Sequence, residues 1–218
     1  MHGHDIALTQ RQYCVCMTTT LPREAPAVTT PVALMTAEEL LMYPMPDKRV
    51  ELVRGRLVVR EPPGMRHGEF AVRMVVALSN FLLRDRELRE AVDTLGRVFT
   101  CDSGFTLARN PDTVRGPDVA YVSRQRLTGP VPVGYGEFAP DLAIEIRSPS
   151  DRIGAVLAKV GDLLDAGSQL VWVVNPARQQ VTVFSADGSQ EVLGAGDFLS
   201  GGEVLPGFAY SIAELFAE

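Results

Sequence analysis

Long apolar runs, targeting signals and paired cysteines are all missing from this sequence. No stretch approaches the roughly 20 consecutive apolar residues that a transmembrane helix needs, and no basic region followed by an apolar one marks a secretory signal. The 3 cysteines are an odd number, and Cys14 and Cys16 lack the two-residue gap of zinc or thioredoxin motifs. We therefore predict a soluble, cytoplasmic protein with reduced thiols and no membrane association. The less favoured alternative for these cysteines is a metal cluster with His2 and His4.

Positive charge, and lysine in particular, is also scarce. The chain has 21 Lys and Arg against 27 Asp and Glu, which gives a net charge of −6. Because non-specific DNA binding rests on basic side chains that displace phosphate counterions, this balance argues against a DNA-coating protein. It allows a nuclease, whose carboxylates hold metal. Lys48 and Lys159 are the only lysines, so Lys159 gains interest as a functional candidate. No Walker A loop or dinucleotide-binding glycine pattern supports nucleotide-driven chemistry.

The sequence does contain enough apolar residues for one folded domain. Of its 218 residues, 46% are hydrophobic and 22% are charged, which is ordinary for a globular protein. Residues 1–35 are rich in Thr and Pro and show no periodicity, so they are predicted to form a flexible extension. A single domain is predicted over residues 36–218. Thr36 and Glu39 have the spacing of a capping box that begins a short helix.

Helical and strand patterns alternate through the predicted domain. Apolar residues at three- and four-residue steps predict a helix over residues 69–83, and further helices are predicted over about 152–166 and 211–218. Residues 50–60 are strand-like and form a hairpin around Gly55. Further strand-like runs lie between residues 94 and 108, broken at residues 102–104, and over residues 117–123, 141–147, 170–175 and 180–184. The pattern indicates an α/β fold in which a mixed β-sheet is flanked by helices.

Two acidic residues occur inside otherwise apolar strands. Asp118 opens one strand, and Glu145 lies between Ile144 and Ile146 in the next. An ionised carboxylate is costly to bury unless it is paired or coordinates a metal. Because side chains two residues apart on a strand share a face, Glu145 and Arg147 are expected to point outward together, away from the apolar face.

Carboxylates on neighbouring strands can bind Mg²⁺, which prefers hard oxygen ligands and keeps several waters. Such a metal polarises a phosphoryl oxygen and activates a bound water, which a nearby lysine can orient or deprotonate. A purely structural alternative stays open at this stage. In that alternative, Asp118 caps a turn after Pro117, and Glu145 pairs with Arg147.

Several short segments form a series whose order and spacing are more specific than any one of them. They are residues 50–55, His67-Gly68, Pro117-Asp118-Val119, residues 140–151, Lys159 followed by Gly167, and residues 171–176. In this series the chain resembles the Uma-two-type family of restriction endonucleases, within the PD-(D/E)XK nuclease superfamily, over roughly residues 36–216. The resemblance implies a restriction-endonuclease-like core.

The resemblance also implies roles for individual residues. Asp118 and Glu145 correspond to the metal-binding catalytic carboxylates, and Ile146 adds its backbone carbonyl to them. Lys159 corresponds to the catalytic lysine that family members carry on the following helix. Glu51 corresponds to an acidic catalytic residue that completes the metal or water shell. The implied cofactor is Mg²⁺, with Mn²⁺ as a substitute.

Four further positions qualify these implied roles. Arg147 stands where the superfamily usually has a lysine, and arginine can hold a phosphate but is a poor base. His67 matches a family position as an accessory residue, and a hydrogen-bonded histidine is favoured over a metal ligand. Leu163 stands where the family often has a tyrosine, so polar support near the site is lost. Asp162 is expected to face solvent.

The predicted function is therefore Mg²⁺-dependent endonuclease activity, in which a metal-activated water hydrolyses phosphodiester bonds of DNA. The alternative is a non-catalytic binding or regulatory module that keeps the nuclease fold, and a third possibility is hydrolysis of another phosphorylated substrate. The expected partner is nucleic acid, DNA in particular. Family analogy also implies a homodimer, because nucleases that cut both strands often need two active sites.

Overall fold

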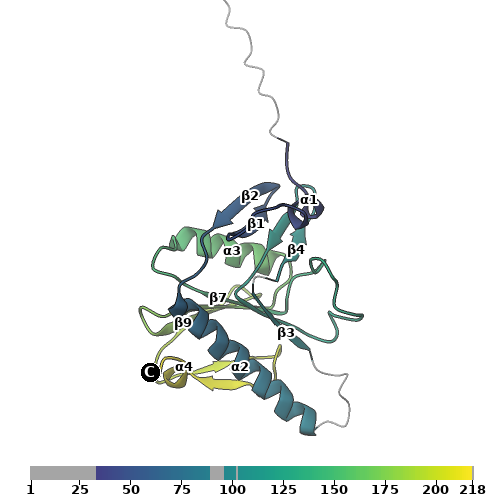
Figure 1. Cartoon of the computed structure of the whole chain (residues 1–218). Helices are drawn as coiled ribbons and strands as arrows, with labels where there is room; N and C mark the ends of the chain where they lie inside the picture. The colour runs from purple at the N-terminus through teal and green to yellow at the C-terminus, as the bar shows by residue number, and fades with distance from the viewer. Residues whose placement is uncertain (1–32, 89–95, 102, 218) are drawn as a thin grey trace, which may run out of the picture. The chain divides into compact units, whose positions relative to one another are not determined.

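The computed structural model describes residues 33–88, 96–101 and 103–217 (Figure 1). Most of the predicted N-terminal extension, including its cysteines and histidines, lies outside these residues. The predicted capping box is confirmed, because the Thr36 side chain accepts a hydrogen bond from the Glu39 amide and the Glu39 side chain accepts one from the Thr36 amide. Helix α1 (Ala37–Leu41) begins directly after it.

The larger β-sheet of the described residues is mixed. Its six strands lie in the order β10-β9-β8-β7-β6-β3, and within it β7 and β8 are parallel while the other neighbours are antiparallel. The bounds are β3 (Arg97–Thr100), β6 (Val119–Val122), β7 (Leu142–Ile146), β8 (Leu170–Asn175), β9 (Gln180–Ser185) and β10 (Gln190–Leu193).

A second, antiparallel sheet has the order β2-β1-β5-β4. Its strands are β1 (Arg49–Val53), β2 (Arg56–Arg60), β4 (Phe105–Ala108) and β5 (Thr113–Arg115). Arg54 and Gly55 join β1 to β2, and both have positive φ, 49° and 72°, as a two-residue hairpin turn requires. The hairpin predicted around Gly55 is confirmed.

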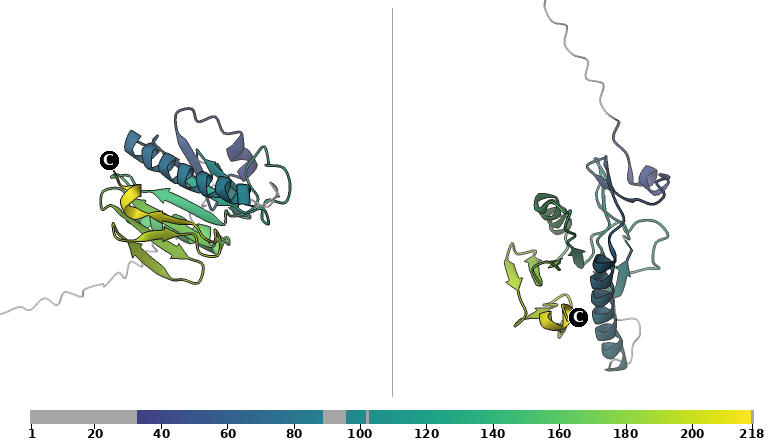
Figure 2. Two further views of the ribbon diagram at one scale, coloured as in Figure 1. Left: turned by 90° about the horizontal axis from the view of Figure 1, so that it is seen from below. Right: turned by 60° about the vertical axis from the view of Figure 1, so that its left-hand side comes forward.

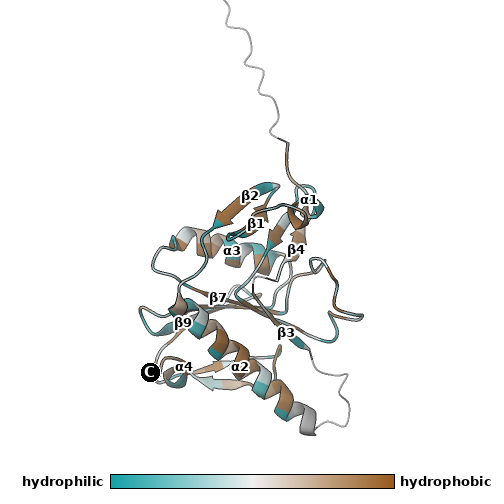
Figure 3. Ribbon diagram, in the orientation of Figure 1, coloured by the Kyte–Doolittle hydropathy of each residue, from teal (hydrophilic) through white to brown (hydrophobic). Residues whose placement is uncertain are grey.

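The remaining elements are helices and one small sheet. They are α2 (Met65–Leu88), α3 (Ile153–Asp165), α4 (Ile212–Leu215), and the pair β11 (Phe198–Ser200) and β12 (Ala209–Ser211). Helix α2 is longer at both ends than the sequence predicts. Figure 3 shows apolar and hydrophilic segments alternating along it, as an amphipathic helix requires. No helix among the described residues is long and apolar enough to cross a membrane.

Helices α2 and α3 cover opposite faces of the larger sheet (Figures 1 and 2). On one face, Leu142, Ile144 and Ile146 of β7 belong to the core that also contains Met74 and Leu78 of α2. This apolar face of β7 is the one that the sequence predicts. The mixed α/β fold with flanking helices is confirmed.

The other face of β7 is covered as well. Ala143 packs against Val156, Val160 and Leu163 of α3, and Glu145, on the same face, is only 8% exposed. Glu145 therefore lies on the face opposite the apolar one, as expected, but the expectation that this face points outward is wrong. The reason lies in the parallel pairing of β7 with β8, because the connection between parallel strands crosses one face of the sheet and carries α3 there.

Candidate active site

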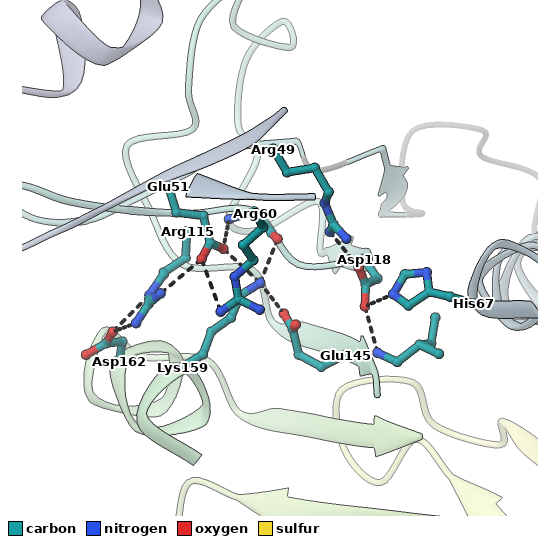
Figure 4. Close-up of polar contacts among 11 residues, drawn as sticks. Arg49, Glu51, Arg60, His67, Arg115, Asp118, Glu145, Lys159 and Asp162 are labelled. Carbon is teal, nitrogen blue, oxygen red and sulfur yellow. Dashed lines mark hydrogen bonds and ion pairs between the residues drawn. The ribbon is translucent and has the colours of Figure 1, made fainter. Parts of the chain in front are cut away.

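Strands β6 and β7 bring the two acidic residues together. Val119 of β6 lies opposite Ile144 of β7, and the same register, continued by one residue, places Asp118 opposite Glu145. Both residues are buried: Asp118 is 6% exposed and Glu145 is 8% exposed. Figure 4 shows Glu145, Asp118 and their polar partners at the junction of β1, β6, β7, α2 and α3.

Asp118 is held by donors from three elements. Its Oδ1 accepts a hydrogen bond from Arg49 Nη2 of β1 at 2.7 Å, and its Oδ2 accepts from the Ile146 amide at 2.7 Å and from His67 Nε2 of α2 at 3.0 Å. Burial raises the pKa of Asp118, but His67, the charge of Lys159 and the Ile146 amide together hold that pKa below its ordinary value. Asp118 is therefore ionised, and His67 is a hydrogen-bonded histidine in this structure.

Lys159 reaches the same junction from α3 and is 2% exposed. Its Nζ donates a hydrogen bond to the Gly116 carbonyl at 2.7 Å and lies 2.8 Å from Oε1 of both Glu51 and Glu145. Burial lowers the pKa of Lys159, but the charges of Glu145, Glu51 and Asp118 outweigh burial and raise it above its ordinary value. The ammonium therefore stays charged near neutral pH, which favours an orienting role over removal of a proton.

Glu51 is fixed on β1 by three donors. Its Oε1 accepts from the Gly116 amide at 3.0 Å and faces Lys159, while its Oε2 accepts from Arg115 Nη1 at 3.0 Å. Burial raises the pKa of Glu51, but the charges of Lys159 and Arg115 lower it to about 2. Glu51 is therefore a permanent anion behind Lys159.

Glu145 has the opposite electrostatic balance. Its Oε1 contacts Lys159 as an ion pair without hydrogen-bond geometry, and no other donor among the described residues reaches this oxygen. Burial, followed by the charges of Asp118 and Glu51, outweighs Lys159 and raises the pKa of Glu145 to about 8. Near neutral pH, Glu145 therefore holds a proton in the absence of another cation.

The structure also places residues that the sequence reading did not assign to the site. Arg49 pairs with Asp118, and Arg115 bridges Glu51 to Asp162. The expectation that Asp162 faces solvent is wrong, because its side chain is 23% exposed and accepts hydrogen bonds from Arg115. The position of Arg49, two residues before Glu51 on one strand face, is a signal that could have identified it.

An open cleft of about 680 Å³ gives access to these groups. It is lined by Glu51, Asp118, Glu145, Ile146 and Lys159, together with His67 and the arginines Arg49, Arg60, Arg147 and Arg152. The alternative pairing of Glu145 with Arg147 is not the contact observed, because the ion pair of Glu145 is with Lys159. Glu61 and Asp151 also line the cleft, so its rim carries both signs of charge. The four arginines suit a phosphodiester backbone, because arginine binds phosphate through a planar fork of N–H donors.

The carboxylates suit a hard divalent cation. No cluster of three or more His, Cys, Asp and Glu side chains that could hold a metal occurs within the described residues. Mg²⁺ does not require one, because it keeps several waters and commonly uses one or two carboxylates. Glu145 Oε1 is a buried oxygen without a hydrogen-bond donor, and two carboxyl groups lie opposite each other across β6 and β7. Asp118 and Glu145 are the carboxylates that could hold such an ion, and Ile146, whose backbone carbonyl the resemblance adds to them, lines the same cleft.

A mixed sheet that carries opposed carboxylates, with a lysine from the adjoining helix, defines the class of restriction-endonuclease-like proteins. Residues 37–213 match the family described as "Uma2: Putative restriction endonuclease", and the chain belongs to this family. The resemblance drawn from the sequence is confirmed.

Solved structures with the same fold include one that matches over nearly its whole length. It is a crystal structure from Anabaena variabilis, described as a "putative nuclease belonging to DUF820", with a TM-score of 0.70 and 22% sequence identity. The match covers 84% of this chain and 97% of that one. No curated protein matches the sequence.

Proposed function

We propose that this protein is a divalent-metal-dependent endonuclease that hydrolyses phosphodiester bonds of DNA, with Mg²⁺ or Mn²⁺ as its cofactor. The observation that carries the proposal is the placement of Asp118 opposite Glu145, with Lys159 Nζ 2.8 Å from Glu145, in an arginine-lined cleft. Membership of a family described as restriction endonucleases supports the same reaction class.

Each side chain has a task in this reaction. A bound Mg²⁺ would polarise a phosphoryl oxygen and acidify a water molecule. Asp118 and Glu145 would hold it, and the Ile146 amide and His67 keep Asp118 oriented. Lys159, which stays protonated, orients the attacking water and stabilises negative charge that develops on the phosphate. Arg147 holds phosphate and cannot serve as the base.

The test is cleavage of supercoiled and linear DNA with Mg²⁺ or Mn²⁺. We expect cleavage by the wild-type protein, loss of cleavage on chelation, and loss in Asp118→Ala, Glu145→Ala and Lys159→Ala. The exposed Lys48→Ala variant, which lies outside the cleft, serves as the control and should cleave normally. Full activity of Glu145→Ala would refute the assignment.

Because a two-fold dimer would present two clefts to the two strands, we also propose a homodimer, to be tested by sedimentation.

A second candidate function is supported by the ion pairs within the site. Arg49 occupies Oδ1 of Asp118, and Lys159 lies against Glu145, so the protein's own cations already neutralise these carboxylates in part. A non-catalytic nuclease-fold module that binds or regulates would show this arrangement permanently. Calorimetric titration with Mn²⁺ separates the two functions, because the enzyme binds the ion and the module does not.

A further inference from the structure

A chain of ion pairs runs from Glu51 through Arg115 to Asp162 (Figure 4). Arg115, 4% exposed, donates from Nη1 to Glu51 Oε2 at 3.0 Å. Its Nε and Nη2 both donate to Asp162 Oδ2, at 2.9 and 2.5 Å. The Arg115 guanidinium therefore connects a carboxylate on β1 with one on α3.

Asp162 and Lys159 are neighbours on α3. Residues three apart lie on the same side of a helix, so both side chains project toward the segment 115–116. This segment contacts both side chains. Arg115 donates a hydrogen bond to Asp162, and the Gly116 carbonyl accepts one from Lys159. The same segment binds Glu51 through the Gly116 amide and Arg115. Two consecutive residues thus connect α3 with Glu51.

This arrangement limits where the ammonium of Lys159 can lie. A lysine is a point charge on a flexible stem, so its position depends on the groups that surround it. Arg115 engages Oε2 of Glu51 and leaves Oε1 to face Lys159. Asp162 in turn helps to balance the positive charge of Arg115. Without Asp162, the buried Arg115 guanidinium would have Glu51 as its one anionic partner.

We propose that Arg115 and Asp162 are positioning residues, which hold Glu51 and α3 so that the ammonium of Lys159 stays beside Glu145. Neither residue lines the cleft or touches the carboxylates of Asp118 and Glu145, so they act through Glu51 and Lys159. The inference rests on the proposed function for its catalytic consequence, but the position of Lys159 is measurable without any cleavage.

The experiment compares Asp162→Asn with Asp165→Asn. Both variants remove one negative charge from the end of α3, but Asp165 is exposed and Asp162 binds Arg115. Lys159 is followed by nitrogen-15 NMR of lysine side chains in a Lys48→Arg background, where Lys159 is the single lysine. We expect hydrogen exchange of its ammonium to accelerate by about ten-fold or more in Asp162→Asn and to stay unchanged in Asp165→Asn.

The kinetic consequence is a loss of turnover without a loss of binding. In Asp162→Asn we expect kcat for DNA cleavage to fall by about 10- to 100-fold, with KM within about two-fold, because misplacement of a catalytic group mainly affects the transition state. Arg115→Gln, which loses the fork that joins two carboxylates and leaves Lys159 as the single lysine of the Lys48→Arg background, should act in the same direction and serves if Asp162→Asn does not fold.

The outcomes are distinguishable. Identical ammonium exchange in Asp162→Asn and Asp165→Asn overturns the positioning role. Faster exchange in Asp162→Asn supports it even if no variant and no wild-type protein cleaves DNA, in which case the proposed function alone fails. If the ammonium exchange accelerates in Asp162→Asn while its kcat equals that of an active Asp165→Asn variant, the catalytic consequence of the positioning is refuted.

Discussion

Asp118 and Glu145 are the same kind of group on facing strands, yet their surroundings give them different charge states. Asp118 receives hydrogen bonds from Arg49, Ile146 and His67, whereas Glu145 faces the ammonium of Lys159, which Glu51 shares. When buried anions compete for one cation, the least compensated one takes up a proton. For Glu145 a divalent cation would replace that proton.

This charge state predicts how the stability of the metal-free protein depends on pH. The folded pKa of Glu145, about 8, lies above its ordinary value of 4.5, so its stabilising contribution is full below pH 4.5 and is lost as pH rises through 8. The loss is at most about 1.4 kcal/mol per pH unit. Glu51, with a pKa of about 2, acts in the opposite sense and only at lower pH, where its contribution is lost as pH falls.

Denaturant unfolding of wild-type protein and Glu145→Gln, from about pH 5 to about pH 9, measures this dependence. The variant keeps the neutral state at every pH. The free energy of unfolding of the wild type should therefore decline with rising pH relative to the variant. Parallel pH profiles of the two proteins would show that Glu145 is already ionised and would contradict the prediction.

Lys159 is expected to matter for both stability and cleavage. Lys159→Met leaves Glu51 and Glu145 buried without their shared cation, which should cost about 3–5 kcal/mol of unfolding free energy. Lys48→Met removes an exposed pair with Glu61 and should cost less than about 1 kcal/mol. Adding Glu51→Gln to Lys159→Met should restore part of the stability and none of the cleavage. Unchanged stability of Lys159→Met would contradict the buried ion pairs.

At the scale of elements, the sequence predicted the acidic pair but not its surroundings. Asp118 and Glu145 were identifiable because an acidic residue inside an apolar strand needs a partner. Arg115 lies beside Glu51 only because β5 pairs with β1, where Val114 is opposite Leu52. Local periodicity does not report which strands pair or where a helix docks. The contact of Arg115 with Glu51, and the burial of Glu145 under α3, therefore could not be predicted from local periodicity.

The packing of α3 yields a prediction for Leu163. The sequence reading noted a lost tyrosine at this position, and the structure places Leu163, 0% exposed, among Ala143, Val156 and Val160. Leu163→Ala should lower the unfolding free energy by about 2–5 kcal/mol, because it opens a cavity beneath the helix that carries Lys159. Leu157→Ala on the exposed side of α3 should change it by about 0.5 kcal/mol or less. Equal losses in the two variants, measured by denaturant unfolding, would contradict this packing.

At the scale of the whole molecule, an acidic chain gathers several arginines at one cleft. The chain carries a net charge of −6, yet Arg49, Arg60, Arg147 and Arg152 line the cleft that exposes the acidic pair. A protein of this kind gains little from overall attraction to a polyanion. Binding must instead depend on a few phosphate contacts at the rim, so both affinity and salt dependence should respond to single arginines.

Arg147 provides the sharpest case, because it follows Glu145 by two residues and its Nε is buried without a hydrogen-bond partner among the described residues. Arg147→Ala should weaken binding to duplex DNA similarly for different sequences and reduce the slope of log K against log salt by about one, as the loss of one phosphate contact requires. Arg178→Ala, at an exposed position outside the cleft, is the matched control and should leave the slope unchanged. Fluorescence anisotropy with a labelled duplex, without metal so that no cleavage intervenes, measures both variants. If Arg147→Ala changes the affinity for one DNA sequence only, Arg147 reads bases rather than phosphate. If the salt slope of Arg147→Ala equals that of the wild type and of Arg178→Ala, Arg147 does not bind phosphate and the prediction is wrong.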